Sequence, residues 1–397
     1  MKGLAVSFSC VVWLAGWALS AGDAAAQSTS PASSRLSFAK AITFPTEVQE
    51  PLSIAAGDLN GDGFPDLAVV TPDGGYYPYL SYALGKGNGR FGSWQRGPGP
   101  PAPGGVVLAD VERNGRLDAL MVDGFGSDLF IDFGDGRGSF KSYEEINNVN
   151  PNYFVVIDVN GDGIPDVVGS GGGPDSVFVL LGQGKKKFGQ PTTYPSGGDS
   201  PQGIAVGDLR RSGIRDLVVA NNGNLSGGNA NVAVLLGNGD GTFQNPVTYP
   251  AGTEPLVVVL GDFDGDGHLD IAVCNPTDNQ VHVLLGKGDG TFSAAKAYPA
   301  GQGPISIVIA DFNGDGKLDL AVANDTYPGY ASVLLGNGDG TFQKPRRFPV
   351  GSNSWQLVVA DFNQDGKPDI ATVNNGDDSV SILLNTTKFP VRPRRQH

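Results

Sequence analysis

The sequence predicts an all-β protein that closes into a ring, a seven-bladed β-propeller whose blades are four-stranded antiparallel sheets. A unit of about 50 residues recurs seven times in the 397-residue chain, and this spacing is typical of propeller blades. The apolar stretches of each unit are short, rich in Val, Ile, Leu and Phe, and bounded by Gly, Pro, Asn or Asp, which favours strands over helices. Glycine supplies 60 residues and charged side chains only 17% of the chain, as expected where turns outnumber solvated helix faces.

The clearest copy of the unit runs from Pro304 to Pro349. We expect a first strand at 304–309, an acidic loop at 311–319, a second strand at 320–324 and a third at 331–335. A glycine-rich turn at 336–340 then leads to a fourth strand, which begins near Phe342. The Asp that opens each acidic loop falls at Asp58, Asp110, Asp158, Asp208, Asp262, Asp311 and Asp361.

The two ends of the repeat region predict how the ring closes. The last copy has a third strand at 381–384 but almost nothing after it that could form a fourth. Residues 37–45 align without a gap on the fourth-strand segment 242–250 and match its hydroxyl, aromatic, β-branched and proline positions. We therefore expect the N-terminal segment to complete the seventh blade, which would leave no open sheet edge at the seam.

The chain divides into four predicted parts. Lys2, an apolar run from Leu4 to Leu19 and the small residues 24–26 have the layout of a secretory signal over residues 1–26. An uncleaved membrane anchor is the alternative, because the run approaches the length of a spanning helix. A short linker at 27–35, the propeller at 36–388 and a basic tail at 389–397 follow, so we expect a secreted protein, extracellular or periplasmic, with no membrane span after cleavage. Cys274 has no disulfide partner in the mature chain and follows an apolar run, so we interpret it as a small buried hydrophobe.

The acidic loops predict metal sites. Their pattern, Asp-x-Asn/Asp-x-Asp-Gly-x-x-Asp, places oxygen side chains at positions 1, 3, 5 and 9, which suits a hard cation such as calcium, and glycine at position 6 permits a sharp turn. A plain Asx/Gly-rich hairpin would explain one copy, but five intact copies favour metal. An EF-hand needs a Glu at position 12, where this chain has Val69, Gly169, Val273, Val322 or Thr372. We expect about five Ca²⁺ ions, with these ligands: Asp58, Asn60, Asp62 and Asp66; Asp158, Asn160, Asp162 and Asp166; Asp262, Asp264, Asp266 and Asp270; Asp311, Asn313, Asp315 and Asp319; Asp361, Asn363, Asp365 and Asp369.

Two loops depart from this pattern. The loop with Asp110, Glu112, Asn114 and Asp118 keeps oxygen at every ligand position and is predicted to be a weak metal site. The loop that opens at Asp208 has Arg210 at position 3 and Ser212 at position 5. We expect Arg210 to replace the ion by an internal salt bridge.

The acidic loop within each unit, the Phe-Gly-like start of the fourth strand and the sevenfold count together resemble the FG-GAP (VCBS-type) repeats of the integrin alpha-subunit propeller. The resemblance covers Leu36 to Lys388. It implies that the calcium loops lie on one face of the disc and that ligands are met on the opposite face. Integrin-like cell adhesion itself is not implied, because no stalk or membrane-spanning segment accompanies the repeats in this sequence.

The function predicted from the sequence is binding rather than catalysis. The net charge of −14 repels phosphate backbones, so nucleic acid is excluded as a partner, and an extracellular protein or glycan is expected, bound by a monomer. His268, His282 and His397 are the only histidines and form no catalytic set, so we expect no enzyme. A calcium-stabilised lectin is the alternative, and a polysaccharide-active enzyme a weaker one. The candidate ligand-face residues are the aromatic side chains Tyr76, Tyr77, Tyr79, Tyr327, Tyr330 and Trp355, although some of them could instead fill gaps between blades.

Overall fold

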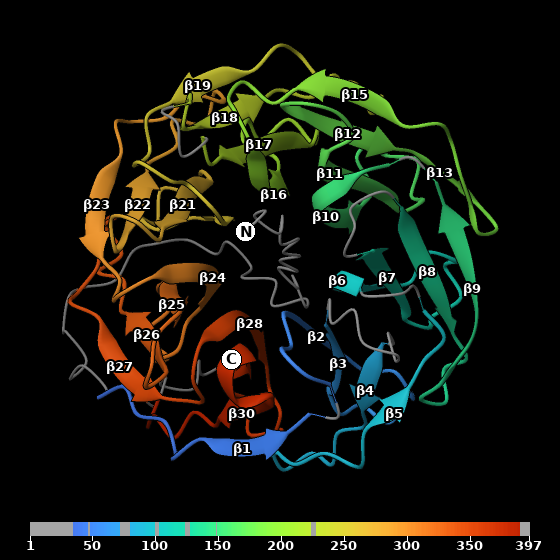
Figure 1. Cartoon of the computed structure of the whole chain (residues 1–397). Helices are drawn as coiled ribbons and strands as arrows, with labels where there is room; N and C mark the ends of the chain where they lie inside the picture. Colours follow the sequence, from blue (N-terminus) through green and yellow to red (C-terminus); the bar gives the residue numbers. More distant parts are fainter. Residues whose placement is uncertain are drawn as a thin grey trace, which may run out of the picture.

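The computed structural model of the chain describes residues 35–46, 48–71, 80–99, 103–123, 128–147, 149–223 and 228–389. The predicted signal at 1–26 lies outside the described residues, as do the linker before Arg35 and the tail after Phe389. Within these ranges the chain forms seven four-stranded antiparallel sheets arranged as a ring (Figure 1), together with a two-stranded hairpin. The prediction of a seven-bladed propeller is confirmed.

Each blade is numbered by its order in the chain, and its strands are given from the centre of the ring outwards. Blade 1 contains β2 (Ser53–Gly57), β3 (Asp66–Val70), β4 (Ser81–Ala83) and β5 (Gln95–Arg96); blade 2 contains β6 (Pro103–Ala109), β7 (Asp118–Asp123), β8 (Leu129–Gly134) and β9 (Phe140–Ile146). Blade 3 contains β10 (Pro151–Ile157), β11 (Asp166–Gly171), β12 (Ser176–Leu180) and β15 (Thr192–Pro195), with the hairpin β13 (Gly182–Gly184) and β14 (Lys187–Phe188). Blade 4 contains β16 (Pro201–Gly207), β17 (Asp216–Asn221), β18 (Asn231–Leu235) and β19 (Val247–Tyr249).

The remaining three blades follow the same order. Blade 5 contains β20 (Val258–Gly261), β21 (Asp270–Asn275), β22 (Gln280–Leu284) and β23 (Lys296–Pro299); blade 6 contains β24 (Pro304–Ala310), β25 (Asp319–Asn324), β26 (Tyr330–Leu334) and β27 (Arg346–Pro349). Blade 7 contains β28 (Ser354–Ala360), β29 (Asp369–Asn374), β30 (Ser379–Leu383) and the N-terminal strand β1 (Ile42–Pro45). The short 3-10 helix η1 (Asn375–Asp377) connects β29 to β30.

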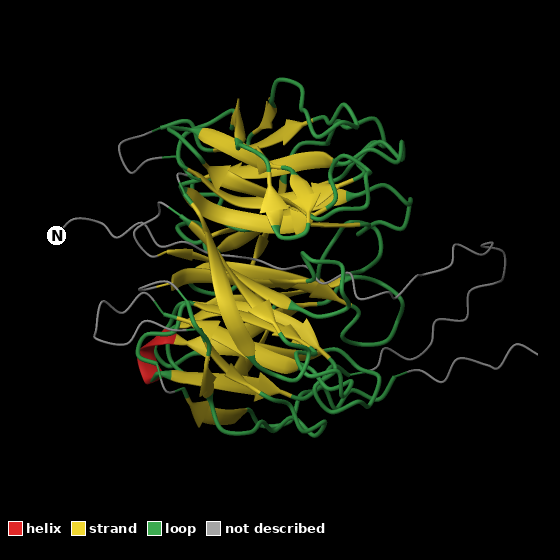
Figure 2. Cartoon of the chain, turned by 90° about the vertical axis from the view of Figure 1, so that its right-hand side faces the viewer, coloured by secondary structure: helices red, strands yellow, loops and turns green. Residues whose placement is uncertain are grey.

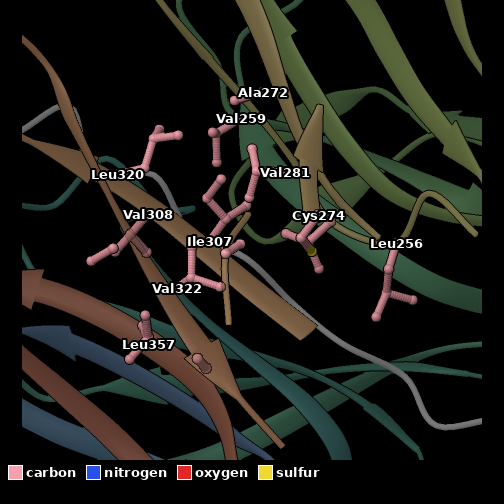
Figure 3. Close-up of a cluster of buried hydrophobic side chains, with 14 of the residues drawn as sticks. Leu256, Val259, Ala272, Cys274, Val281, Ile307, Val308, Leu320, Val322 and Leu357 are labelled. Atoms are coloured by element: carbon pink, nitrogen blue, oxygen red, sulfur yellow. The ribbon is translucent and has the colours of Figure 1, made fainter. Parts of the chain in front are cut away.

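The blades stack face to face around the axis, which explains their apolar sequences. Every residue of β21, β25 and β29 is buried, because each second strand is covered on both faces by neighbouring blades. The largest apolar cluster therefore runs through several blades (Figure 3), and Ile307, Val322 and Leu357 meet within it. Cys274 is buried in the same cluster, which confirms its interpretation as a small hydrophobe.

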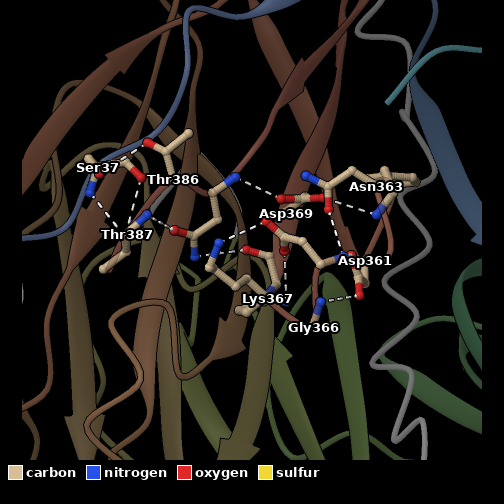
Figure 4. A network of polar contacts seen from close by, with 12 residues as sticks. Ser37, Asp361, Asn363, Gly366, Lys367, Asp369, Thr386 and Thr387 are labelled. Atoms are coloured by element: carbon tan, nitrogen blue, oxygen red, sulfur yellow. Dashed lines mark hydrogen bonds and ion pairs between the residues drawn. The ribbon is translucent and has the colours of Figure 1, made fainter. Parts of the chain in front are cut away.

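The N-terminal segment closes the ring as predicted. β1 pairs with β30 in antiparallel register, from Ile42 opposite Ile382 to Pro45 opposite Ser379. The pairing extends further, because the Ala39 amide donates to the Leu384 carbonyl over 2.8 Å and Phe38 bridges to Asn385. Ser37, Thr386 and Thr387 add hydroxyl contacts at the same place (Figure 4). Strands from opposite ends of the chain thus share one sheet.

Aromatic side chains join consecutive blades at the fourth strands. The Tyr or Phe near the end of one fourth strand packs against the Phe that begins the next, with ring centroids 4.8–5.7 Å apart, a distance typical of favourable aromatic pairs. These pairs are Tyr194 with Phe243, Tyr249 with Phe292, Tyr298 with Phe342, Phe348 with Phe38, and Phe44 with Phe91. The aromatic residue that precedes proline at the end of these fourth strands, as in Tyr298-Pro299, therefore makes a contact between blades.

The disc has two distinct faces. Because the strands of a blade alternate in direction, the loops between first and second strands lie on one face and those between second and third strands lie on the other. η1, a connection of the second kind, marks one side of the disc in Figure 2. In the described part of the chain no helix is long or apolar enough to cross a membrane.

Candidate metal loops and ligand face

All seven acidic loops occupy the same place in their blades. Position 1 follows the first strand, and position 9 is the first residue of the second strand, as Asp66 is in β3 and Asp270 in β21. The loops therefore form a ring on one face of the disc. The connections between third and fourth strands lie on the same face and contact the acidic loops.

Backbone amides fix the position 1 carboxylate in each intact loop. Asp262 accepts hydrogen bonds from the amides of Gly265 and Gly267 at 2.7 and 2.9 Å. These glycines have φ of +79° and +82°, a region that other residues rarely adopt. Both bonds recur at Asp58, Asp158 and Asp311. Asp361 accepts the position 6 amide of Gly366 at 2.7 Å and the position 5 amide of Asp365 at 3.0 Å. The predicted sharp turn is therefore present in all five intact loops.

The position 9 carboxyl is fully buried in every blade and accepts two backbone amides. Asp270 accepts them from Phe263, at position 2 of its own loop, and from Gly286, just after the third strand, both at 2.7 Å. In blades 1, 2, 3, 5, 6 and 7 burial is the main cause that raises the pKa of this carboxyl, and the neighbouring loop carboxylates raise it further while the two amides lower it. The pKa reaches about 6 for Asp66 and Asp118, about 7 for Asp270 and Asp369, and about 8 for Asp319.

Gly286 and its equivalents were not singled out from the sequence as part of the site. They are Gly85, Gly134, Gly182, Gly237 and Gly336, and each donates its amide to the position 9 carboxyl of its own blade. A Cβ on Gly286 would lie 2.2 Å from the Leu269 carbonyl oxygen, so glycine is required for this close approach. The glycine that recurs after each Val-Leu-Leu stretch was the available signal. In blade 7 the amide of Asn385 takes this role.

In blades 1, 5, 6 and 7 the next blade donates a hydrogen bond to the backbone of the acidic loop. The Gly340 amide in blade 6 donates to the Phe263 carbonyl in the blade 5 loop at 3.0 Å, and the Gly89 amide in blade 1 donates to the Phe362 carbonyl in the blade 7 loop at 2.9 Å. Blade 7 has no turn between its third and fourth strands, because its fourth strand is the N-terminal β1. The Asn385 side chain instead donates to the Phe312 carbonyl at 2.8 Å. Loop geometry and ring closure therefore depend on each other.

The loop of blade 5 shows the strongest convergence of carboxylates. Asp262, Asp264 and Asp270 each offer one oxygen, and these oxygens lie within 4.8 Å of one another. In the other four intact loops position 3 is Asn, and its side-chain oxygen accepts the position 5 amide at 2.8–3.1 Å, as Asn60 does from Asp62. The ligand positions thus supply an all-oxygen donor set, which fits a calcium ion.

In each of the two atypical loops a cation of the protein pairs with one acidic side chain. In blade 4, the Arg210 guanidinium contacts the buried Asp216 carboxylate at 2.7 Å and also donates to the Gly237 carbonyl, so the predicted salt bridge is confirmed. In blade 2, Glu112 pairs with Lys186 of blade 3 at 3.5 Å. Lys186 belongs to the turn between β13 and β14, which in blade 3 is a hairpin. Glu112 at position 3 is therefore already engaged with a protein cation.

The predicted ligand-face aromatics are placed in different ways. Tyr76, Tyr77 and Tyr79 lie outside the described residues. Tyr327, between β25 and β26, is 85% exposed. Tyr330 accepts a hydrogen bond from the Gln302 amide at 2.8 Å and lies under the Arg347 guanidinium at 4.5 Å. Trp355 in β28 is partly buried against the core, as expected of a residue that fills a gap between blades.

Comparison with known proteins identifies the repeat. The family model for the FG-GAP-like repeat matches residues 58–121, 158–219, 211–273, 262–322 and 311–372. Each matched stretch begins in or beside an acidic loop and ends in the second strand of the following blade. No curated protein sequence matches the chain.

Several solved structures share the fold. One is an Agrocybe aegerita lectin described as recognising non-reducing terminal N-acetylglucosamine, with a TM-score of 0.53 at 19% identity over 84% of this chain and 94% of the lectin. The lectin BP39L from Burkholderia pseudomallei has a TM-score of 0.60 at 14% identity, over 86% and 98% of the two chains. BBS1N, solved in complex with ARL6DN, has a TM-score of 0.61 at 15% identity, over 90% and 98%. At these identities the similarity describes the fold alone.

Proposed function

Because the chain belongs to the FG-GAP-like repeat family, we propose that it is a secreted, non-catalytic binding module whose disc is stiffened by about five calcium ions. The proposed ligand is a glycan or an extracellular protein. Calcium would be held by the ligand positions of the five intact loops, and its chemistry there would be to neutralise and join carboxylates. The loop backbones and the neighbouring blades orient those side chains.

The buried position 9 carboxyl carries the proposal for calcium. Asp66, Asp270, Asp319 and Asp369 are fully buried, and no described cationic side chain forms an ion pair with them. A buried carboxylate is costly unless it is paired. In blade 4 the equivalent Asp216 is paired with Arg210, so a positive charge at this point of the loop is compatible with the fold. A calcium ion would supply that charge in the intact loops.

Glycan binding on the face opposite the acidic loops is the more specific form of this proposal. Tyr327 supports it, because an aromatic ring that is 85% exposed on a loop can stack on a sugar ring or anchor a protein partner. Two of the structural neighbours are lectins, so this architecture supports sugar binding elsewhere. Tyr330 and Trp355 contact other residues of the protein, so we expect them to support the shape of the binding face rather than to contact the ligand.

A glycan array with calcium present tests this form of the proposal, and it should include glycans that end in N-acetylglucosamine. For a glycan that binds, Tyr327→Ala should weaken binding while leaving the melting temperature nearly unchanged. Tyr143→Ala is the matched control, because Tyr143 is 51% exposed on the outer strand β9 of blade 2. Equal binding by the parent and Tyr327→Ala would refute this face as the site. No glycan bound on the array would leave an extracellular protein as the proposed ligand.

A further inference from the structure

A groove lined by cations lies at the seam where the ring closes. Two adjacent cavities of about 540 and 530 Å³ share Arg35, Leu36 and Phe348 as lining residues. Arg346 and Arg347 complete the lining of the first, and Lys388 that of the second, together with Ser37, Phe38 and Thr386. The groove thus lies between the outer strand β27 of blade 6 and the N-terminal segment that completes blade 7.

The charge of the groove is opposite to that of the whole chain. Arg35, Arg346, Arg347 and Lys388 line it, and no Asp or Glu of the described residues does, although the net charge of the chain is −14. None of these four side chains forms an ion pair with another described residue. The adjoining sequences 27–34 and 390–397 contain no acidic residue, so neither supplies a counter-charge.

Protection of an exposed sheet edge is the simpler explanation for cations on β27. The other outer strands, however, do not carry a comparable number of cations. β1, β15 and β19 contain no cation at all, and β5, β9 and β23 contain one each, whereas β27 begins with two adjacent arginines. Edge protection also leaves unexplained why Arg35 and Lys388, from opposite ends of the chain, line the same groove.

We propose that this groove binds an acidic polysaccharide, one that carries sulfate or carboxylate groups. Arginine side chains offer paired donors that match carboxylate and sulfate oxygens. Ser37 and Thr386 add hydroxyls, and Leu36 and Phe348 add apolar surface, which together suit the polar edges and flat faces of sugar rings. The two adjacent cavities share three lining residues and bring four cations together, which fits a chain with several charged groups better than a single small anion. The groove-lining Arg347 also contacts the ring of Tyr330, but Tyr327 does not line the groove, so the two proposals have separate tests.

The test compares dextran sulfate with unsulfated dextran of the same length, because the two differ only in charge. Binding is measured by calorimetry with the full mature chain, in calcium and at low salt, since exposed charges are screened by salt. Dextran sulfate should bind and dextran should not. The double variant Arg35→Gln/Arg346→Gln should weaken the binding of dextran sulfate by at least about tenfold, as expected for the loss of two charge-assisted contacts.

Lys40→Gln/Lys296→Gln is the matched control for the loss of two charges. Lys296 in β23 lies opposite Val283, as Arg346 in β27 lies opposite Val333, and Lys40 is exposed beside β1. This control should leave binding within about twofold of the parent, because the charges that it removes lie outside the groove. Equal losses in the two double variants would overturn the proposal, as would unchanged binding by Arg35→Gln/Arg346→Gln.

A further arm tests selectivity and folding. Single-stranded DNA of matched charge should compete poorly, and competition as strong as that of dextran sulfate would mean a general attraction for polyanions, which would also overturn the proposal. The melting temperatures of all variants should match that of the parent. Lys388→Gln is the second groove variant, which keeps the test decisive if the double variant fails to fold, and it should weaken binding in the same direction.

Discussion

The acidic loops of blades 4 and 5 hold the same buried carboxyl with the same backbone contacts and differ in how its charge is balanced. Asp216 accepts amides from Leu209 and Gly237, and Asp270 accepts them from Phe263 and Gly286. Position 3 is Arg210 in blade 4 and Asp264 in blade 5. The arginine pairs with Asp216, whereas Asp264 brings a further carboxylate close to Asp270. Position 3 therefore supplies a cation in blade 4 and a further carboxylate in blade 5, and we propose that only the blade 5 loop takes its cation from solution.

Calcium removal gives the largest expected effect. If calcium fills the intact loops as proposed, a chelator would remove their counter-charge, whereas the blade 4 loop would keep Arg210. At a calcium concentration a hundredfold above Kd, each filled site stabilises the folded state by about 2.7 kcal/mol. The melting temperature should therefore fall markedly in chelator, and elemental analysis of the calcium-loaded protein should find about five ions per chain. An unchanged midpoint, or fewer than about three ions, would contradict the calcium proposal.

Substitution of Arg210 gives the next largest effect and tests the comparison directly. Arg210→Met leaves the Asp216 carboxylate buried without its partner, which should cost about 3 kcal/mol of unfolding free energy, because breaking a buried pair exposes the desolvation penalty of the remaining charge. Arg210→Asp should lose at least as much stability without calcium but regain part of it when calcium is added. Denaturant unfolding at several calcium concentrations measures both variants. If calcium stabilises the two variants equally, position 3 does not control the source of the cation.

A third buried carboxyl, Asp132 in β8, should give the smallest effect when stability is compared between conditions one pH unit apart. It is fully buried, neither of its oxygens has a hydrogen-bond partner, and burial raises its pKa to about 8. Between about pH 4 and pH 8 the folded state therefore retains a proton that the unfolded state has lost, so this group makes stability fall as pH rises. The limit is about 1.4 kcal/mol per pH unit for one proton.

Asp132→Asn should remove that contribution, so that the variant gains stability relative to the parent as pH rises from about 4 to 8. Denaturant unfolding across this range at fixed calcium measures the difference. Glu144→Gln on the neighbouring strand β9 is the control, because Glu144 is exposed and its replacement should leave the pH dependence unchanged. Parallel pH profiles for Asp132→Asn and the parent would contradict the assignment.

Much of the architecture was predictable because the same sequence pattern recurs in each of the seven blades. Seven acidic loops at even spacing predicted seven blades. The match between residues 37–45 and 242–250 predicted that the N-terminal segment supplies the fourth strand of blade 7, where β1 lies. Arg210 was predictable as a cation within reach of Asp216, since both belong to one nine-residue loop. The sharp turn of the loop backbone was also predictable, because glycine at position 6 permits the positive φ of the turn.

The sequence by itself determined the features that depend on neighbouring residues and on their repetition, namely blade number, strand order, loop chemistry and the closing strand. Only the tertiary structure decided which groups meet across blades. It placed Trp355 against the core and left Tyr327 exposed, it buried Asp132 without a partner, and it placed Arg35, Arg346 and Lys388 around one groove. The physical reason is that propensity and spacing act over a few residues, whereas burial and the surroundings of a charge depend on packing between segments that lie hundreds of positions apart.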